Sequence, residues 1–394
     1  MIDFSKEGKV VITCFDRYAP YLEMELKELG FSPADVHRTH VELKASLEDC
    51  IFLNMHLRTA SHVLFEIQSF TLKHIQDLYK KVKNISWEDY LEKDGYFSVI
   101  SNVAHESVDN PLFANLKIKD AIADRFREKF GVRPDSGSAL NGTVFQFFWK
   151  ESEASIYINT SGETLIKHGY RKIPGNAPMM EALVSATLLA SGWDRKSPFV
   201  NPMCGSGTVA IEAALLATNR YPGLYRDEYA FMHIKGYDPG HYRKLKKELD
   251  RKINDHVDFD IIASDISNRA ITASKTNAST AGVEHLIRFE VCDFRDTTVP
   301  EAETGAMFLN PEYGERLGEE DELELVYREI GDFMKKRCSG YTGLVFTGNL
   351  DLGKKVGLKP KRRIPFYNGT IDCRLLVFEL YKGSRRGEPG SAPV

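Results

Sequence analysis

Residues 201–217, NPMCGSGTVAIEAALLA, decide the fold. A short apolar strand, PFVNP (198–202), runs into Gly205-Ser206-Gly207 and then into an alanine-rich helix predicted over 207–219. Glycines at such a turn let the backbone approach a ligand closely, and the helix N-terminus offers N–H groups and a positive dipole end. The pattern predicts a nucleotide-type pocket, although a simple tight strand–helix connection produces the same turn. No Lys-Ser/Thr pair follows the second glycine, which excludes a Walker A phosphate loop.

Outward from this turn, apolar strand-like runs alternate with helical ones, as is typical of a parallel sheet covered by helices. The end of the chain departs from this alternation. Residues 362–380 form two β-rich runs around Asn368 and Gly369, which predicts a hairpin with a type I′ turn and positive φ at both residues. A parallel sheet finished by an antiparallel hairpin resembles the outline of a class I, Rossmann-like methyltransferase domain. The predicted strands are 260–265, 288–293, 306–311 and 343–349, and the predicted helices are 267–281 and 323–336.

The first 165 residues predict an α+β arrangement. With 394 residues in all, the chain is long enough for two or three domains, which we place at 1–60, 61–165 and 166–394. A Tyr- and Lys-rich insertion at 221–258 lengthens the third of these and predicts added helical structure. In the first half the predicted strands are 10–15 and 41–46, the predicted helices are 20–29, 47–60, 71–83 and 112–130, and the runs 143–150 and 154–162 predict a hairpin.

Composition excludes several classes of protein. The net charge of −4 excludes a chain that holds nucleic acid simply by being basic throughout, so a nucleic-acid partner requires local patches. The six cysteines are scattered without C-x-x-C pairs, which favours a reducing, cytoplasmic setting and implies no zinc or other metal. We expect no signal peptide and no membrane anchor, because the apolar runs are far shorter than a membrane span requires.

Polar side chains follow the predicted strands at the ends where a ligand binds in such sheets. Asp265 is placed to accept the hydroxyls of a ribose, and Asp293 to reach the amino group of an adenine. Asn310 and the Pro311 carbonyl form two acceptors aimed at one point, and the Tyr313 ring can stack on a flat base. Together these groups can hold an exocyclic amine with its lone pair directed at an electrophilic methyl group. Taken singly, each is more ordinary: a helix cap, a turn residue or an Asn-Pro turn.

These residues resemble the THUMP-domain methyltransferases, in particular those that methylate N2 of guanine in 23S ribosomal RNA. NPMCGSGTVAIEAA is similar to the family's D-P-M-C-G-S-G-T motif, and NPEYGERLG is similar to its N-P-P-Y-G-E-R-L motif. INTSGETLIKHGYRKIPGNAPMMEALVSATLL (158–189) is similar to its D-T-S-G-x-x-L-H-K-R-G-Y-R…A-P-L-K-E segment. The resemblance covers nearly the whole chain, and three motifs of that length in order are highly specific.

The resemblance implies a ferredoxin-like segment at 1–60, a THUMP RNA-binding domain at 61–165 and a methyltransferase domain at 166–394. It also implies S-adenosylmethionine as methyl donor and structured RNA, the large-subunit ribosomal precursor, as partner. Asn310, Pro311, Glu312 and Tyr313 form the predicted catalytic set, and Tyr170 and Arg171 border the RNA channel. The predicted donor-binding residues are Asn201, Pro202, Cys204, Gly205, Gly207, Thr208, Asp265, Ile266, Asp293 and Phe294.

The sequence departs from the family motifs at three positions. Asn201 stands where the family has Asp, His168 where it has Arg, and Glu312 in place of the second Pro of N-P-P-Y. Two hypotheses follow for Glu312. Its carboxylate grips the N1–H and N2–H₂ donors of guanine and rejects adenine, whose N1 is an acceptor, or the change impairs the site.

Several alternatives stay open from sequence alone. The basic run at 354–363, which includes Lys361, Arg362 and Arg363, predicts an RNA contact or a solvated loop. Transfer-RNA guanine and the N6 amine of adenine in DNA are alternative targets, because the N-P-x-Y arrangement serves any exocyclic amine. A non-catalytic RNA-binding assembly factor is a second class of function. An NAD-dependent dehydrogenase would share the glycine turn and Asp265, but it leaves NPEY and the terminal hairpin unexplained.

Overall fold

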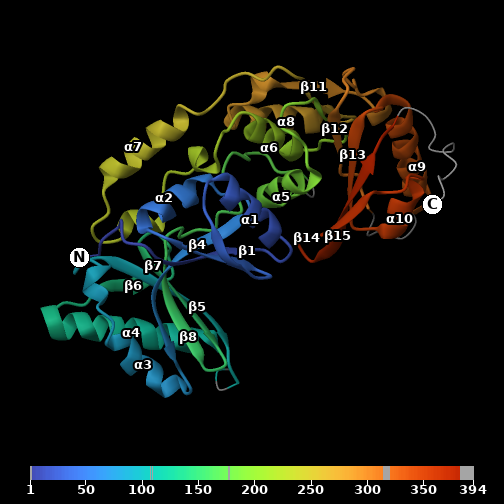
Figure 1. Cartoon of the computed structure of the whole chain (residues 1–394). Helices are drawn as coiled ribbons and strands as arrows, with labels where there is room; N and C mark the ends of the chain where they lie inside the picture. Colours follow the sequence, from blue (N-terminus) through green and yellow to red (C-terminus); the bar gives the residue numbers. More distant parts are fainter. Residues whose placement is uncertain (1, 107, 109, 176–177, 314–319, 382–394) are drawn as a thin grey trace, which may run out of the picture. The chain divides into compact units, whose positions relative to one another are not determined.

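The computed structural model describes residues 2–106, 108, 110–175, 178–313 and 320–381 (Figure 1). The chain forms two compact units, Met1–Gly169 with Tyr221–Lys252, and Tyr170–Arg220 with Ile253–Val394. Most of the predicted insertion therefore packs with the first unit, although the predicted third domain contains it. The boundaries at 60 and 165 remain predictions. Among the described residues, no helix is both long and apolar enough to cross a membrane.

The first unit is built on one mixed eight-stranded sheet in the order β2-β3-β1-β4-β8-β7-β5-β6. The predicted hairpin is confirmed, because β7 and β8 pair antiparallel. The elements are β1 (Gly8–Cys14), α1 (Ala19–Glu28), β2 (Pro33–Val36), β3 (His40–Ala45), α2 (Leu47–His56), β4 (Ala60–Thr71), α3 (Ile75–Lys83), β5 (Tyr96–Ala104), α4 (Pro111–Phe130), β6 (Asp135–Gly137), β7 (Thr143–Lys150), β8 (Glu153–Asn159) and, in the insertion, α7 (Pro239–Asp250).

Strand β4 joins the two predicted N-terminal segments into this one sheet, since it pairs with β1 on one side and with β8 on the other. The helix predicted over 47–60 is too long, because α2 ends at His56. The buried Glu25 carboxylate accepts the backbone N–H groups of Arg58 and Thr59 at 2.9 and 3.0 Å. Those bonds hold the chain out of the helix and direct it into β4.

The first unit should lose stability in mild acid because of two largely buried histidines. Burial lowers the pKa of His56 and of His62 from 6.5 to about 4. Between these values the unfolded chain binds more protons than the folded one, so stability is full above pH 6.5 and falls as the pH drops toward 4. We expect a loss of about 1–2 kcal/mol for each histidine between pH 7 and pH 5.

Urea unfolding at the two pH values measures this loss. In a Trp193→Phe variant, the remaining tryptophans, Trp87 and Trp149, lie buried in the first unit, so their fluorescence reports that unit alone. The variants His56→Gln and His62→Gln should each remove about half of the pH dependence. Equal unfolding midpoints for the native chain at pH 7 and pH 5 would contradict the assignment.

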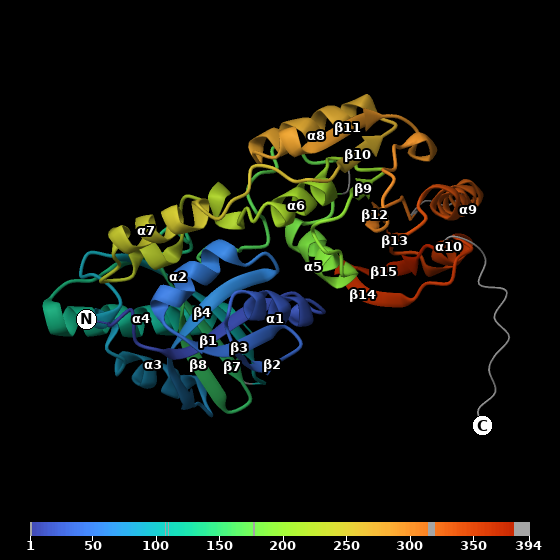
Figure 2. The ribbon, with the colours of Figure 1, turned by 45° about the horizontal axis from the view of Figure 1, so that its top comes forward.

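The second unit has a seven-stranded sheet in the order β11-β10-β9-β12-β13-β15-β14 (Figure 2). The first five strands in this order, β11 through β13, run parallel, and β15 and β14 close the sheet as an antiparallel pair. The predicted α/β class and topology are therefore confirmed. The elements are α5 (Glu181–Ser191), β9 (Phe199–Asn201), α6 (Thr208–Ala217), β10 (Ile261–Asp265), α8 (Asn268–Thr280), β11 (Ile287–Val291), β12 (Gly305–Leu309), α9 (Glu320–Arg337), β13 (Tyr341–Thr347), α10 (Leu350–Lys355), β14 (Arg362–Asn368) and β15 (Ile371–Glu379).

Helices pack on this sheet through apolar side chains. Ile330 and Phe333 of α9 lie in one core cluster with Met307 of β12 and Val345 of β13. Helices α6 and α8 contact β9, β10 and β11. Strands whose side chains are buried in this way read as continuous apolar runs, which is why the sequence showed them clearly.

The turn of the terminal hairpin differs from the prediction by one residue. Asn368 pairs with Ile371, so the two turn residues are Gly369 and Thr370 rather than Asn368 and Gly369. Positive φ occurs only at Gly369, at +61°, so the turn is not type I′. Asn368 is the last residue of β14, and its side chain is engaged elsewhere.

Candidate active site

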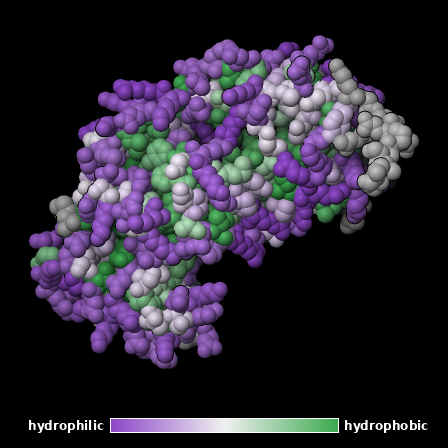
Figure 3. Space-filling view, viewed as in Figure 1, coloured by the Kyte–Doolittle hydropathy of each residue, from purple (hydrophilic) through white to green (hydrophobic). Residues whose placement is uncertain are grey.

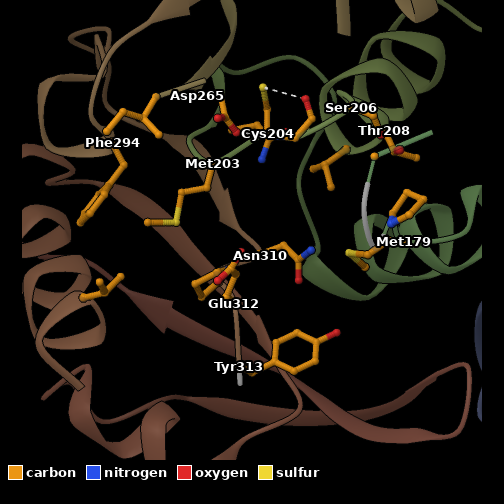
Figure 4. Close-up of a pocket in the computed structure, with 18 of the residues that line it drawn as sticks. Met179, Met203, Cys204, Ser206, Thr208, Asp265, Phe294, Asn310, Glu312 and Tyr313 are labelled. Carbon is orange, nitrogen blue, oxygen red and sulfur yellow. Dashed lines mark hydrogen bonds between the residues drawn. The ribbon is translucent and has the colours of Figure 1, made fainter. Parts of the chain in front are cut away.

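A pocket of about 920 Å³ lies in the second unit, where β9, β10 and β12 end (Figure 4). Successive strands are added on one side of β9 as far as β11 and on its other side from β12 onward, so β9 and β12 flank the point where the strand order switches. Ligands of open α/β sheets bind at such a switch point. Twelve of the predicted donor and catalytic residues line the pocket: Asn201, Cys204, Gly205, Thr208, Asp265, Ile266, Asp293, Phe294, Asn310, Pro311, Glu312 and Tyr313. Pro202 and Gly207 do not line it. Sequence reasoning missed Gly175, Pro178, Met179, Met203, Ser206, Val209, Leu323, Val326, Asn368 and Ile371.

The two glycines of the turn have different roles. Both have positive φ, +56° at Gly205 and +84° at Gly207. A Cβ added at Gly205 would meet no atom within 4 Å, so this glycine leaves open space beside the pocket. A Cβ added at Gly207 would lie 2.8 Å from Oγ of Ser274, so this glycine lets α6 and α8 pack closely. The prediction that glycines allow a close approach to a ligand therefore fits Gly205, while Gly207 serves helix packing.

Asp265 holds the glycine turn in place. Its Oδ2 accepts the N–H of Gly205 at 3.0 Å, and its Oδ1 accepts the N–H of Ser267 at 2.9 Å. A carboxylate has about four acceptor positions, so each oxygen keeps a second lone pair. Ile266, which follows it, is 74% exposed and lines the pocket. The end of β10 thus combines an acceptor pair with an exposed apolar side chain, which suits a sugar and a base.

Asp293 is occupied by a neighbour. Its carboxylate accepts two hydrogen bonds from the Arg295 guanidinium, both at 2.8 Å, and these bonds lower the pKa of Asp293. Arg295 also donates to Glu329 at 2.9 Å. Phe294 is buried against Phe333, with ring centroids 6.0 Å apart. The predicted contact of Asp293 with an adenine amino group stays a prediction, and Arg295 competes for the same oxygens.

Two other residues of the glycine motif are buried beside the pocket. Asn201 donates from Nδ2 to the Phe308 carbonyl at 2.8 Å, a bond that an ionised Asp at this position cannot make. It fastens the end of β9 to β12. Burial raises the pKa of the Cys204 thiol to about 12, so this cysteine stays protonated and is unsuited to nucleophilic attack.

Asn310, Glu312 and Tyr313 lie on the side of the pocket opposite Cys204 and Asp265 (Figure 4). Oδ1 of Asn310 is buried and has no hydrogen-bond partner among the residues that the structure describes. A buried acceptor without a partner is costly, and a donor on a ligand removes that cost. Glu312 is exposed, and Pro311 is buried beneath it. Residues 314–318 of the NPEYGERLG motif lie outside the described residues.

Tyr313 is held by the terminal hairpin and packs closely against the glycine that follows β13. Nδ2 of Asn368 donates to the Tyr313 hydroxyl at 2.9 Å. A Cβ added at Gly348 would lie 3.0 Å from the Tyr313 ring and 2.7 Å from Ile371, so this glycine makes room for both side chains. The only sequence signal for Asn368 was the Asn-Gly pair, which we interpreted as turn chemistry.

The burial of Tyr170 does not fit its predicted RNA contact, and the RNA contact of Arg171 stays a prediction. Tyr170 is fully buried, and its hydroxyl donates to Glu212 at 2.9 Å. Arg171 donates to the Met179 carbonyl at 2.6 Å and to Oγ1 of Thr208 at 3.0 Å. These bonds lie inside the second unit and hold the segment before α5 against α6, while Nε of Arg171 is buried without a hydrogen-bond partner among the described residues.

The basic run at 354–363 is partly neutralised by carboxylates that lie outside the run. Lys354 pairs with Asp351 and Lys355 with Glu324, both at 2.7 Å. Lys361 pairs with Glu379, and Arg362 donates to the Ser191 carbonyl at 3.0 Å. Arg363 is exposed. An RNA contact by Lys361, Arg362 and Arg363 stays a prediction.

Three family models match the chain. A model described as the RMKL-like methyltransferase domain matches residues 168–376, just over half of the chain. A THUMP domain model matches residues 73–137, and a model described as the RlmL ferredoxin-like domain matches residues 9–64. The order of the three matches confirms the family and the kinds of domain predicted from the motifs.

Curated relatives carry the name ribosomal RNA large subunit methyltransferase K/L. The protein of Psychromonas ingrahamii is 35% identical over 371 residues, which are 92% of this chain and 49% of that protein. The protein of Syntrophotalea carbinolica is 34% identical over 370 residues, 92% of this chain and 52% of that protein. The chain therefore spans about half the length of the curated relatives it matches.

Solved structures match the chain over nearly its whole length. SMU.472 in complex with SAH has 27% identity and a TM-score of 0.86, covering 96% of this chain and 100% of that one. A protein named as a predicted N6-adenine-specific DNA methylase from Listeria monocytogenes has 29% identity and a TM-score of 0.85, covering 96% of this chain and 97% of that one. These neighbours carry the same arrangement of elements.

Proposed function

Because the chain belongs to the family of RMKL-like methyltransferase domains, we propose that it transfers a methyl group from S-adenosylmethionine to the exocyclic N2 amine of a guanine in 23S ribosomal RNA. The observation that carries the proposal is Oδ1 of Asn310, which has no hydrogen-bond partner among the described residues and lies in the pocket that Gly205 and Asp265 also line. The curated relatives are named for large-subunit ribosomal RNA, and the THUMP match supports an RNA partner. The proposed substrate implies a cytoplasmic enzyme.

The pocket suits an adenosyl donor. Its volume of about 920 Å³ is in the range of cofactor sites. The open space at Gly205 accommodates a ligand against the backbone, Asp265 keeps acceptor positions for ribose hydroxyls, and Ile266 and Phe294 offer apolar surface for a base. SMU.472, which shares the fold, was crystallised with SAH. When bound, the donor supplies an electrophilic methyl group.

The chain's own residues position the acceptor amine. Oδ1 of Asn310 and the Pro311 carbonyl accept the two amine hydrogens, which directs the nitrogen lone pair away from them and toward the donor side of the pocket. The Tyr313 ring, fixed by Asn368, stacks on the base. Methyl transfer forms the N–C bond as the S–C bond breaks, S-adenosylhomocysteine is the leaving group, and the methylated amine then loses one proton. Among the described residues that line this pocket we assign no general base, so that proton passes to water, and the arrangement works by orientation and electrostatics.

Nucleoside mass spectrometry of ribosomal and transfer RNA, from cells with and without the gene, tests the proposal. We expect one N2-methylguanosine to be missing from 23S ribosomal RNA in the deletion strain and to return with the native chain. A mark missing from transfer RNA, or an N6-methyladenine missing from DNA, would replace the proposed target. Donor binding with no missing mark would favour a non-catalytic assembly factor.

Variants of Glu312 distinguish between the two hypotheses for this residue, recognition of guanine by its carboxylate and impairment of the site. The carboxylate is exposed at the pocket beside Asn310, where it can accept N1–H of guanine. We expect Glu312→Pro to lower methyl transfer to guanine by about 10- to 100-fold, the effect of losing one or two hydrogen bonds to a charged group. Glu312→Gln, which keeps one acceptor, should fall in between. A Pro variant more active than the native chain would refute recognition.

Asn368 should act through the Tyr313 hydroxyl. We expect Asn368→Ala to slow methyl transfer about 5- to 10-fold at saturating donor, because one hydrogen bond that fixes the ring is lost. The affinity for S-adenosylhomocysteine should not change. Tyr313→Phe removes the same bond, so Asn368→Ala should have little further effect in that background. Equal effects of Asn368→Ala in the two backgrounds would contradict the coupling.

A further inference from the structure

Helix α7 and the two residues after it form a dense group of cations in the first unit. The group consists of Arg243, Lys244, Lys246, Lys247, Arg251 and Lys252, and the structure records no ion pair for any of them among the residues it describes. All but Lys246 are exposed. Residues 221–252 hold eight basic and five acidic residues, net +3, whereas residues 1–165 hold 19 and 25, net −6. The insertion therefore adds positive charge to an acidic unit.

Four of the six cations share one face of the helix. Arg243, Lys247 and Arg251 follow one another at four-residue spacing, which places them in a row, and Lys244 lies next to that row. Leu249 is only 2% exposed and lies on the opposite, packed face. Hydrophilic side chains follow the outer edge of α7 (Figure 3).

The helix is fixed on its unit rather than carried by a loose loop. Before α7, the Arg226 guanidinium donates to the carbonyls of Ser161, Glu163 and Thr164 at 3.0, 2.6 and 3.0 Å. At its C-terminal end, Asp250 accepts the Tyr221 hydroxyl at 2.6 Å.

Aromatic side chains of the insertion pack together between these two anchors. Phe231 stacks on Tyr229, with ring centroids 4.9 Å apart, and contacts Tyr242 of α7 at 5.8 Å. Tyr229 and Phe231 are almost fully buried. Such anchoring holds the charged row in one place, so little ordering is required when an anion binds.

The basic run at 354–363 differs from the row on α7 in its ion pairs. In that run Lys354, Lys355 and Lys361 are each paired with a carboxylate. A cation already paired gains less from a phosphate, because the existing ion pair must first be broken. The row on α7 faces no such competition among the described residues.

We propose that the row Arg243, Lys247 and Arg251 on α7 binds the phosphate backbone of the RNA substrate. The inference rests on the proposed function, which supplies RNA as the partner. Flexible cations on an exposed helix contact phosphates without reading bases, so this contact adds affinity and orientation while the pocket selects the nucleotide. RNA helices are recognised largely through such shape and backbone contacts.

The test compares RNA binding of two charge-reversal variants of the full chain. Arg243→Glu with Lys247→Glu alters the row, and Lys6→Glu with Lys336→Glu makes the same change in net charge at exposed positions elsewhere. An unmodified 23S ribosomal RNA transcript is titrated in 50–300 mM KCl. We expect the row variant to bind at least tenfold more weakly at 100 mM KCl and to reduce the slope of log K against log salt by about 1.5–2, since two phosphate contacts are lost. The control should stay within threefold of the native chain.

Two further measurements separate this proposal from its alternatives. An unchanged urea midpoint of the first unit, followed by Trp87 and Trp149 fluorescence in the Trp193→Phe background, verifies that the row variant is folded. Arg243→Lys with Lys247→Arg should retain RNA affinity, because charge is kept. If the row variant binds RNA as the control does, the cations serve another anionic partner or none, and the proposal is wrong. If the native chain binds RNA through α7 but methylates none, the proposed function fails while this contact stands.

Discussion

Replacing Asn310 by Ala is expected to lower the rate of methyl transfer by about 100- to 1,000-fold, the effect of removing one preorganised acceptor at the reacting group. The affinity for S-adenosylhomocysteine should change less than threefold, because the residues proposed to hold the donor lie on the other side of the pocket. Stability should not fall, since the substitution removes a buried oxygen for which the structure records no partner among its described residues. Single-turnover assays, calorimetry with S-adenosylhomocysteine and thermal unfolding measure the three quantities.

The variant Asn310→Asp provides the matched control. It keeps an acceptor of nearly the same shape, so it should recover part of the lost rate, while Asn310→Gln displaces the acceptor by one methylene and should not. A structural role would predict the opposite pattern, with Ala reducing the unfolding temperature and rate in parallel. Activity of Asn310→Ala within fivefold of the native chain would exclude the proposed mechanism.

The fold of the second unit could be predicted because its information is local. Each strand is a short apolar run, each helix follows at a helical period, and the glycine turn marks the point where the first strand meets its helix. The same locality identified Asp265, Asn310 and Tyr313 as strand-end residues, and the pocket contains all three.

Errors arose where a distant residue decides the local structure. The Asn-Gly pair predicted a type I′ turn, but Asn368 donates to Tyr313, which lies 55 positions earlier, and the turn moves by one residue. Tyr170 belongs to a motif whose resemblance to the family does not indicate whether the side chain is buried. In the structure its hydroxyl donates to Glu212 of α6 in the interior. A local sequence pattern cannot show a hydrogen-bond partner that is distant in the chain and is brought close only by folding.

The insertion shows the same limit at the level of domains. Residues 221–252 follow α6 in the chain, so sequence order assigned them to the methyltransferase domain. Instead, their buried aromatic side chains and the hydrogen bonds from Arg226 to backbone carbonyls attach them to the first unit. Chain order is a good guide to domain membership only where the inserted segment has no apolar surface of its own to bury.

Replacing Asp265 by Ala is expected to weaken binding of S-adenosylhomocysteine about 100-fold or more. The carboxylate holds the Gly205 and Ser267 N–H groups, and we propose that its remaining lone pairs accept the ribose hydroxyls. Hydrogen bonds to a charged group contribute about 1.5–3 kcal/mol each, so losing two of them accounts for the effect. Calorimetric titration with S-adenosylhomocysteine measures the affinity, and a thermal scan separates it from unfolding.

Asp293→Asn is the comparison that makes this prediction specific. Both aspartates were predicted from strand ends, but Arg295 already occupies the Asp293 carboxylate and holds its pKa low. A ligand can gain little from oxygens that are already paired, so Asp293→Asn should weaken donor binding less than Asp265→Asn, a substitution of the same shape and charge change. If Asp293→Asn has the larger effect, Arg295 must release that carboxylate on binding, and the adenine amino group would then be the group that replaces it.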